Sequence, residues 1–121
     1  MDKLQTLKHY FGHDGFRAGQ EPLVDALLQG RDCLGIMPTG AGKSMCYQIP
    51  ALMKTGTALV ISPLISLMKD QVAALKSAGV PAAYLNSSLT PRQIDLATER
   101  ARMGAYRIIY VAPERLETLS F

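Results

Sequence analysis

The sequence predicts an α/β domain built on a parallel β-sheet. Four short apolar runs rich in β-branched residues alternate with segments of helical periodicity, an order that favours parallel strands joined by right-handed crossovers. Three of the runs end in proline-containing loops, IMPTG, ISPLI and VAPER. Loops that follow parallel strands meet at one edge of the sheet, where open α/β folds bind ligands. A length of 121 residues with 48% hydrophobic content suits one such domain.

Two short helices are expected ahead of the first strand. Leu4, Leu7 and Phe11 recur at helical spacing within residues 1–11, and a second helix is expected from Glu21 to Leu28, ending at Gly30. The loop GHDGFRAGQ separates the two helices.

A phosphate-binding loop, MPTGAGKS at residues 37–44, is predicted between a strand at 32–37 and a helix. Its glycines allow consecutive backbone N–H groups to form a nest for phosphate oxygens. Lys43 can reach the β- and γ-phosphates, and the Ser44 hydroxyl can bind Mg²⁺. The strict pattern has glycine where this chain has Met37. The alternative, a glycine-rich turn without a ligand, leaves the Gly-Lys-Ser run unexplained.

The helix after this loop is amphipathic, and Pro50 should kink or shorten it. Its apolar positions follow helical spacing at Met45, Ile49, Leu52 and Met53.

Two further βα units and a last strand follow. Residues 57–61 form a continuous apolar run, which indicates a strand buried on both faces. Residues 82–85 and 107–111 are the other two expected strands.

Each of these units has its own expected helix. The first places Leu64, Met68, Val72 and Leu75 on one face and ends at Gly79. In the second, Thr90 and Pro91 are the expected N-cap and first residue of a helix that reaches about Met103.

Composition narrows the class of protein only slightly. The net charge of +3 is compatible with a polyanionic partner but common without one. Cys33 and Cys46 are expected to be reduced core residues, whereas His9 and His13 lack the further ligands of a metal site. No apolar run approaches the length of a membrane span, and no secretory leader is apparent, so a cytoplasmic location without membrane contact is expected.

Four segments in order, FGHDGFRAGQ, PTGAGKS, SPLISLMKDQ and YVAPERL, resemble the RecQ-type DNA helicases of helicase superfamily 2. The resemblance spans essentially the whole chain. It implies a RecA-like P-loop NTPase domain that is incomplete at its C-terminal end, with ATP and Mg²⁺ as cofactors and 3′ to 5′ unwinding of single-stranded or partially duplex DNA. Met37 is then consistent with the family's motif, since superfamily 2 helicases commonly have another residue in place of its first glycine.

The resemblance also implies roles for individual residues. Gln20 would contact adenine, with Phe16 and Arg17 in support, and Lys43 and Ser44 would be catalytic, with Ser44 binding Mg²⁺. The implied nucleotide contacts of the loop are Pro38, Thr39, Gly40, Ala41, Gly42, Lys43 and Ser44.

Two loops would face DNA by the same resemblance. Their residues are Ser62, Pro63, Ser66, Pro113 and Arg115. Without the resemblance, loop and helix-capping chemistry is the preferred interpretation of Ser62, Ser66 and Pro113.

The implied organisation is a helical lead-in at residues 1–30 and βα units at 31–121. The family's acidic Asp-Glu motif, second RecA-like domain and zinc-binding region are not in this sequence, so the chain alone is expected to be an inactive fragment that needs the remaining helicase domains. A bacterial protein of this type would associate with the nucleoid. Two alternatives stay open, namely a non-catalytic module that binds nucleotide or DNA, and another superfamily 2 NTPase such as an RNA helicase.

Overall fold

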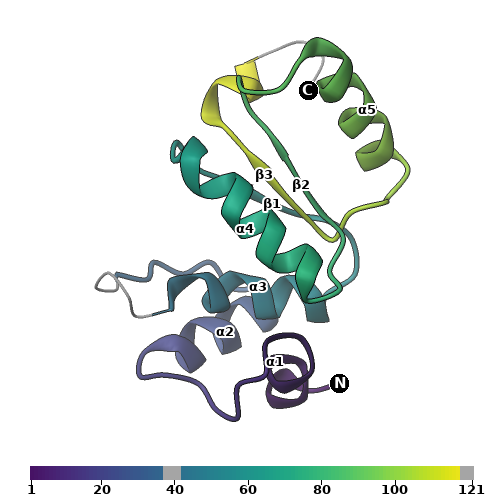
Figure 1. Cartoon of the computed structure of the whole chain (residues 1–121). Helices are drawn as coiled ribbons and strands as arrows, with labels where there is room; N and C mark the ends of the chain where they lie inside the picture. The colour runs from purple at the N-terminus through teal and green to yellow at the C-terminus, as the bar shows by residue number, and fades with distance from the viewer. Residues whose placement is uncertain (37–41, 118–121) are drawn as a thin grey trace. The chain divides into compact units, whose positions relative to one another are not determined.

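The computed structural model describes residues 1–36 and 42–117, drawn in colour in Figure 1. The chain divides into two compact units, Met1–Thr55 and Gly56–Phe121, and each is considered by itself. Five predicted loop positions lie outside the described residues, namely Met37, Pro38, Thr39, Gly40 and Ala41.

The first unit contains three helices, α1 (Lys3–Phe11), α2 (Gln20–Leu28) and α3 (Lys43–Met53). Both helices expected before the phosphate-binding loop are therefore confirmed. Asp2 starts α1 with a capping box, in which its side chain accepts from the Gln5 N–H at 2.8 Å while the Gln5 amide oxygen accepts from the Asp2 N–H at 2.9 Å. The α3 helix passes through Pro50 and ends at Met53, so the proline does not end the helix at its own position.

The core of the first unit joins all three helices. Leu7, Val24 and Ile49 contribute one buried side chain from each helix. Partly buried apolar side chains surround them, namely Phe11, Phe16, Leu28, Met45 and Met53.

An ion cluster joins α1 to α2 on the surface of this core. The Lys3 ammonium lies 2.6 Å from an Asp25 carboxylate oxygen and 2.8 Å from one of Glu21. The hydrogen bond that the Lys3 ammonium donates to Asp25, and after it the one to Glu21, raises the pKa of Lys3. Because all three side chains are partly exposed to solvent, the cluster adds little to the stability of the chain.

The prediction of a strand at residues 32–37 is wrong for residues 32–36, the part of this segment that the structure describes. Residues 31–36 have no regular secondary structure, and the Leu34 and Ile36 side chains are 86% and 89% exposed. A strand is stable only when a neighbour satisfies its backbone groups, and no described strand pairs with this segment. Cys33 is exposed as well, so only Cys46 of the two cysteines is in the core.

The second unit holds a parallel three-stranded sheet in the order β1-β3-β2, which confirms the predicted sheet type. Its strands are β1 (Ala58–Ile61), β2 (Ala82–Leu85) and β3 (Ile108–Val111), and Ala58 and Ala82 both align with Ile108. Residues Pro113–Glu117 form a short 3-10 helix after β3.

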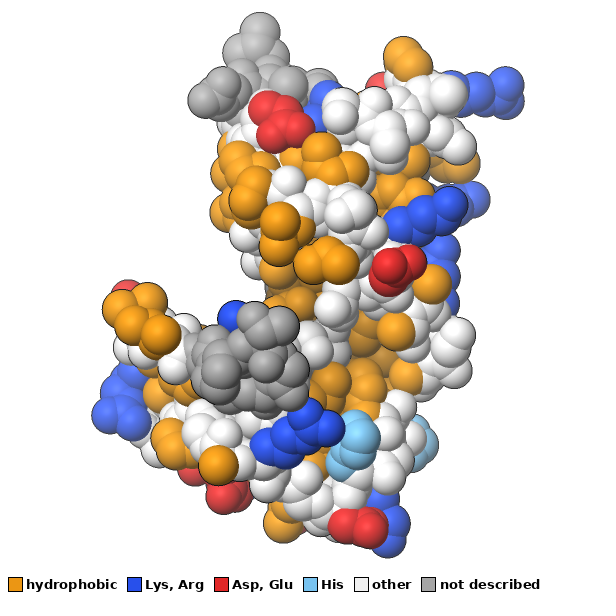
Figure 2. Space-filling view, turned by 60° about the vertical axis from the view of Figure 1, so that its left-hand side comes forward, with side chains coloured by type: hydrophobic (Ala, Val, Ile, Leu, Met, Phe, Trp, Pro, Cys, Tyr) orange, Lys and Arg blue, Asp and Glu red, His pale blue; other side chains and the backbone are white. Residues whose placement is uncertain are grey.

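Burial differs sharply between the strands. All four residues of the central strand β3 are buried. Along β1 the Leu59 and Ile61 side chains are 53% and 54% exposed, so the prediction of a strand buried on both faces is wrong there. Leu59 and Ile61 alternate with the partly buried Ala58 and Val60, so one face of this edge strand is open to solvent. Apolar side chains accordingly reach the surface in several places on the face shown in Figure 2.

The two crossover helices are α4 (Ile65–Ser77) and α5 (Pro91–Arg102). Because the steps from β1 to β2 and from β2 to β3 run in opposite directions across the sheet, right-handed crossovers place the helices on opposite sides of β2 (Figure 1).

Sequence signals locate both helices well. Of the four positions predicted to share one face, Met68, Val72 and Leu75 are buried, whereas Leu64 is the N-cap of α4 and its side chain is 55% exposed. Thr90 is the N-cap of α5 and Pro91 its first residue, as the sequence predicts, and the structure adds a capping box between Thr90 and Gln93. None of the helices in the described segments is long and apolar enough to cross a bilayer.

Candidate nucleotide-binding site

The start of α3 is suited to bind an anion. Gly42 is the N-cap in a left-handed conformation (φ 74°), no side chain caps the helix, and no acidic residue lies in the first turn. The first N–H groups of a helix have no partner within the helix and carry the positive end of its dipole. Lys43 and Ser44 are the first two residues of this helix, so a cation and a hydroxyl flank these groups.

The Gln20 side chain joins the preceding loop to this helix start. Gln20 is buried, with 3% of its surface exposed. Its Oε1 accepts from the Arg17 N–H at 2.7 Å, and its Nε2 donates to the Gly42 carbonyl at 2.9 Å. These two bonds fix the orientation of the Gln20 amide.

Gly42 is required at its position for two reasons. Its positive φ disfavours any residue with a Cβ. A Cβ placed there would also lie 2.5 Å from the Gln20 Nε2, closer than such atoms approach in proteins.

A cavity of about 220 Å³ opens beside the helix start. It is lined by Leu7, His13, Gly15, Arg17, Gln20, Gly42, Ser44 and Met45. Of the residues predicted from the sequence, the structure thus brings together Arg17, Gln20, Gly42 and Ser44. Lys43 is exposed and outside the lining set, and Phe16 packs on the core of α1, α2 and α3.

Sequence reasoning missed four of the lining residues, His13, Gly15, Leu7 and Met45. His13 and Gly15 belong to the GHDGFRAGQ loop, and their closeness in sequence to Arg17 could have identified them as candidate site residues. Met45 follows Ser44 directly, but its helical spacing pointed only to the core.

The donors at the cavity fit a magnesium ion only in part. The ion prefers oxygen ligands and usually combines a few protein oxygens with phosphates and water. Ser44 offers one hydroxyl oxygen, and no carboxylate lines the cavity. Over the described residues, no group of three or more His, Cys, Asp or Glu side chains could hold a metal by itself. Bound phosphate oxygens would therefore have to supply most of the coordination.

The residues expected to contact DNA lie at one end of the sheet in the second unit. The Ser62 N–H donates to the Val111 carbonyl at 3.1 Å, which joins the end of β1 to the end of β3. Ser66 lies in the first turn of α4, and Pro113 and Arg115 lie in the 3-10 helix after β3.

Loop chemistry accounts for part of this arrangement. The Ser62 hydroxyl oxygen accepts from the Leu64 N–H at 3.1 Å, as the interpretation without the family expects. Pro63, Ser66 and Pro113 are exposed, and Arg115 is partly buried. The five residues therefore share the carboxyl end of two adjacent strands, where a ligand could reach them.

Similarity to known proteins covers almost the whole chain. The DEAD/DEAH box helicase family model matches residues 17–120. Over 116 residues the chain is 52% identical to the ATP-dependent DNA helicase RecQ of Bacillus subtilis, covering 95% of this chain and 20% of that protein. It is 51% identical over 118 residues to the RecQ of Haemophilus influenzae, covering 98% and 19%. The chain thus spans about a fifth of the length of these relatives.

A solved structure with the same fold is the crystal structure of a hypothetical ATP-dependent RNA helicase from Sulfolobus tokodaii. It aligns with a TM-score of 0.75 over 95% of this chain and 34% of its own, at 23% identity. At 23% identity the match supports the RecA-like helicase fold and nothing about function. With the family match over residues 17–120, it follows that the chain belongs to the DEAD/DEAH box helicase family and, within that family, resembles the RecQ type.

Proposed function

We propose that this chain binds ATP at the start of α3 and serves as the ATP-binding part of an ATP-dependent DNA helicase. One observation carries the proposal. A helix start without a side-chain cap adjoins a cavity lined by Ser44, Gln20 and Arg17, with Lys43 as the first helical residue. Backbone N–H groups, a cation, a hydroxyl and an amide are the groups that a nucleotide requires.

Each group has one part of the nucleotide to bind. The N–H groups at the start of α3 and the Lys43 ammonium would hold the phosphates, together with Pro38, Thr39, Gly40 and Ala41 of the loop. The Ser44 hydroxyl would bind a phosphate-coordinated Mg²⁺. A side-chain amide can accept from N6 and donate to N7 of adenine, which suits Gln20 on the cavity wall.

DNA contact is proposed at the carboxyl end of β1 and β3. Backbone N–H groups and hydroxyls at Ser62 and Ser66, with the Arg115 guanidinium, are of the types that bind phosphates of a single strand. The relatives at 51% and 52% identity are named DNA helicases, which favours DNA over RNA. The 3′ to 5′ polarity rests on the same resemblance.

Rapid ATP turnover is not expected from these 121 residues. Phosphoryl transfer depends on positioned carboxylates, metal and often an arginine supplied by another domain. The sequence has no adjacent Asp-Glu pair of the kind the family uses. We therefore propose that the remaining helicase domains are needed for unwinding.

Calorimetric titration with ATP and Mg²⁺ tests the binding proposal. Lys43→Ala should weaken binding about ten-fold or more, since it removes a full charge from the phosphates. Lys69→Ala, an exposed lysine in α4, is the matched control and should bind as the parent does. Equal affinity of the Lys43→Ala variant and the parent would rule out the phosphate site at α3.

A further inference from the structure

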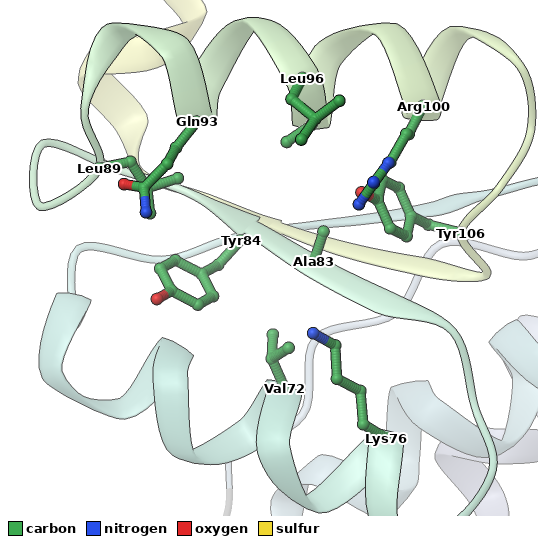
Figure 3. Close-up of a pocket in the computed structure, with 10 residues that line it drawn as sticks. Val72, Lys76, Ala83, Tyr84, Leu89, Gln93, Leu96, Arg100 and Tyr106 are labelled. Atoms are coloured by element: carbon green, nitrogen blue, oxygen red, sulfur yellow. The ribbon is translucent and has the colours of Figure 1, made fainter.

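A second cavity, of about 190 Å³, lies along β2 in the second unit (Figure 3). In this view α5 runs above the strand and α4 below it, and both helices direct side chains toward it. The lining residues are Val72, Lys76, Ala83, Tyr84, Leu89, Gln93, Leu96, Ala97, Arg100 and Tyr106. None of them belongs to the nucleotide cavity or to the loops proposed to contact DNA.

The strand at the base of this cavity has an open edge. Within the described sheet, β2 pairs only with β3. The Leu85 carbonyl accepts from the Ala112 N–H at 3.0 Å and so faces β3. Because successive residues of a strand alternate in direction, the N–H and C=O of Tyr84 face away from β3. An edge of this kind is a template for a further strand.

Both walls of the cavity carry a cation. Lys76 extends from α4 toward the strand, and Arg100 extends from α5 beside the Tyr106 ring (Figure 3). Neither side chain has an ion pair or hydrogen bond to any described residue, and no Asp or Glu lines the cavity. The charge of the cavity is therefore complementary to a carboxylate-rich ligand.

The space between the cations is largely apolar. Val72 is buried beneath it, Leu96 is an exposed leucine of α5, and the Tyr84 and Tyr106 rings are partly buried. Such a surface accepts an aliphatic or aromatic side chain, and the two tyrosines add amphipathic contact area.

We propose that this groove binds an extended acidic peptide segment of a partner protein, which adds a strand to the open edge of β2. One apolar side chain of the segment enters the cavity, and flanking carboxylates lie near Lys76 and Arg100. Strand addition combines main-chain hydrogen bonds for affinity with a pocket for specificity. A nucleic acid would satisfy the cations but has no alternating N–H and C=O groups for the strand edge, which favours a peptide. The inference adds a protein partner to the proposed ATP and DNA sites.

Fluorescence anisotropy with the 121-residue chain tests the charge complementarity. The probe is a fluorescein-labelled peptide, Glu-Val-Phe-Val-Glu, with both ends blocked. Reversing both cations in a K76E/R100E variant should raise its Kd about ten-fold, because two attractions become repulsions. The control is K69E/R92E, which reverses one charge on each of the same helices outside the groove and should leave the Kd unchanged.

A peptide with lysine in place of glutamate completes this comparison. It should bind the parent poorly and the K76E/R100E variant better. Equal binding of the acidic and basic peptides to the parent would overturn the proposal. So would a thymine oligonucleotide that binds the parent and loses affinity in K76E/R100E while the acidic peptide does not bind, since the groove would then be a nucleic-acid surface.

Two N-methylated versions of the acidic peptide test strand addition itself. Each is methylated at one of the two alternating sets of backbone nitrogens, so only one of them loses the N–H groups that face β2. That peptide should bind at least several-fold more weakly, and the other should bind normally. The acidic peptide should also protect the Tyr84 amide from hydrogen exchange. Unchanged affinity of both methylated peptides, or no protection at Tyr84, contradicts a strand at this edge.

Discussion

Gln20 donates a hydrogen bond from Nε2 to the backbone carbonyl oxygen of Gly42, 2.9 Å away and 22 residues further along the chain. The donor is the first residue of α2, and the acceptor is the N-cap of α3. The same amide accepts from the Arg17 N–H, so the segment proposed to read adenine and the helix start proposed to bind phosphate are held together by one buried side chain. Changes at either residue should therefore affect both parts of the site.

Gly42→Ala should destabilise the chain more than Gly12→Ala does. Both glycines have nearly the same φ, 74° and 73°, so each substitution carries the strain of a left-handed alanine, about 1 kcal/mol. Only at position 42 does the new Cβ also meet the Gln20 amide, whereas nothing lies within 4 Å of it at position 12. Urea denaturation of the two variants measures the difference in free energy of unfolding.

The double variant Gly42→Ala with Gln20→Ala separates strain from collision. Removal of the Gln20 amide removes the atom that the new Cβ meets. The double variant should therefore lose less free energy of unfolding than the sum of the losses in the two single variants. Strict additivity, or equal losses at positions 12 and 42, would mean that the amide does not lie against Gly42 in solution.

Gln20→Ala should also reduce the preference for ATP over GTP. Guanine carries an oxygen where adenine carries the N6 amine, so an amide matched to adenine is mismatched to guanine. Loss of a matched bidentate contact commonly costs about 1–3 kcal/mol. Competition of ATP and GTP for the parent and the variant measures this, and a preference of equal size in both proteins would remove Gln20 from base recognition.

The two cysteines should differ in their reaction with iodoacetamide. Cys33 is exposed, whereas Cys46 is 8% exposed and its burial raises the pKa of the thiol. The thiolate is the reactive form, so Cys46 should react slowly and require a higher pH than an ordinary thiol. Mass spectrometry of the Cys33→Ser variant follows Cys46 alone, and rapid alkylation near neutral pH would contradict its burial.

The same pKa shift has a consequence for stability. In the unfolded chain the Cys46 thiol ionises at its ordinary pKa, below that of the folded state. As the pH rises through the ordinary value, the unfolded state loses protons first, and the free energy of unfolding should fall. Cys46→Ser should lessen this fall, and an unchanged pH profile would contradict the shift.

Residues 31–36 should promote self-association as the concentration rises. Leu34 and Ile36 expose apolar side chains in a segment without regular structure. Glutamate at both positions should lower the average mass seen by sedimentation at high concentration. Met103→Glu, which removes one exposed apolar side chain at the end of α5, is the control and should have little effect. A monomeric parent at every concentration would leave this segment without a role in association.

Local signals explain why the helices could be predicted from the sequence. Thr90 and Pro91 are followed by Gln93 at the spacing of a capping box, and these residues determine the start of α5 by contacts within one turn. The apolar positions of α4 follow helical spacing in the same way. Such information lies within a few residues of the element that it predicts.

The predictions from the sequence failed where the structure of a segment depends on contacts with other elements of the fold. Residues 32–36 and 57–61 both have the composition of buried strands, but the first has no pairing partner in the described sheet and the second lies at its edge. The resemblance implies that the Gln20 amide contacts adenine, whereas its bond to Gly42 depends on how α2 and α3 pack, which the sequence does not show. The groove beside β2 likewise combines α4 and α5, which no local pattern relates.

Titration of the 15N-labelled chain with ATP and Mg²⁺, followed by NMR, tests the central claim most directly. The claim predicts that the largest amide shifts fall at Gly42, Lys43 and Ser44, with smaller ones at Arg17 and Gln20, because these groups surround the phosphates and the base. The Lys43→Ala variant should need a much higher ATP concentration to produce the same shifts. Saturating shifts confined to residues outside this set, with Gly42 and Ser44 unmoved, would contradict nucleotide binding at the start of α3.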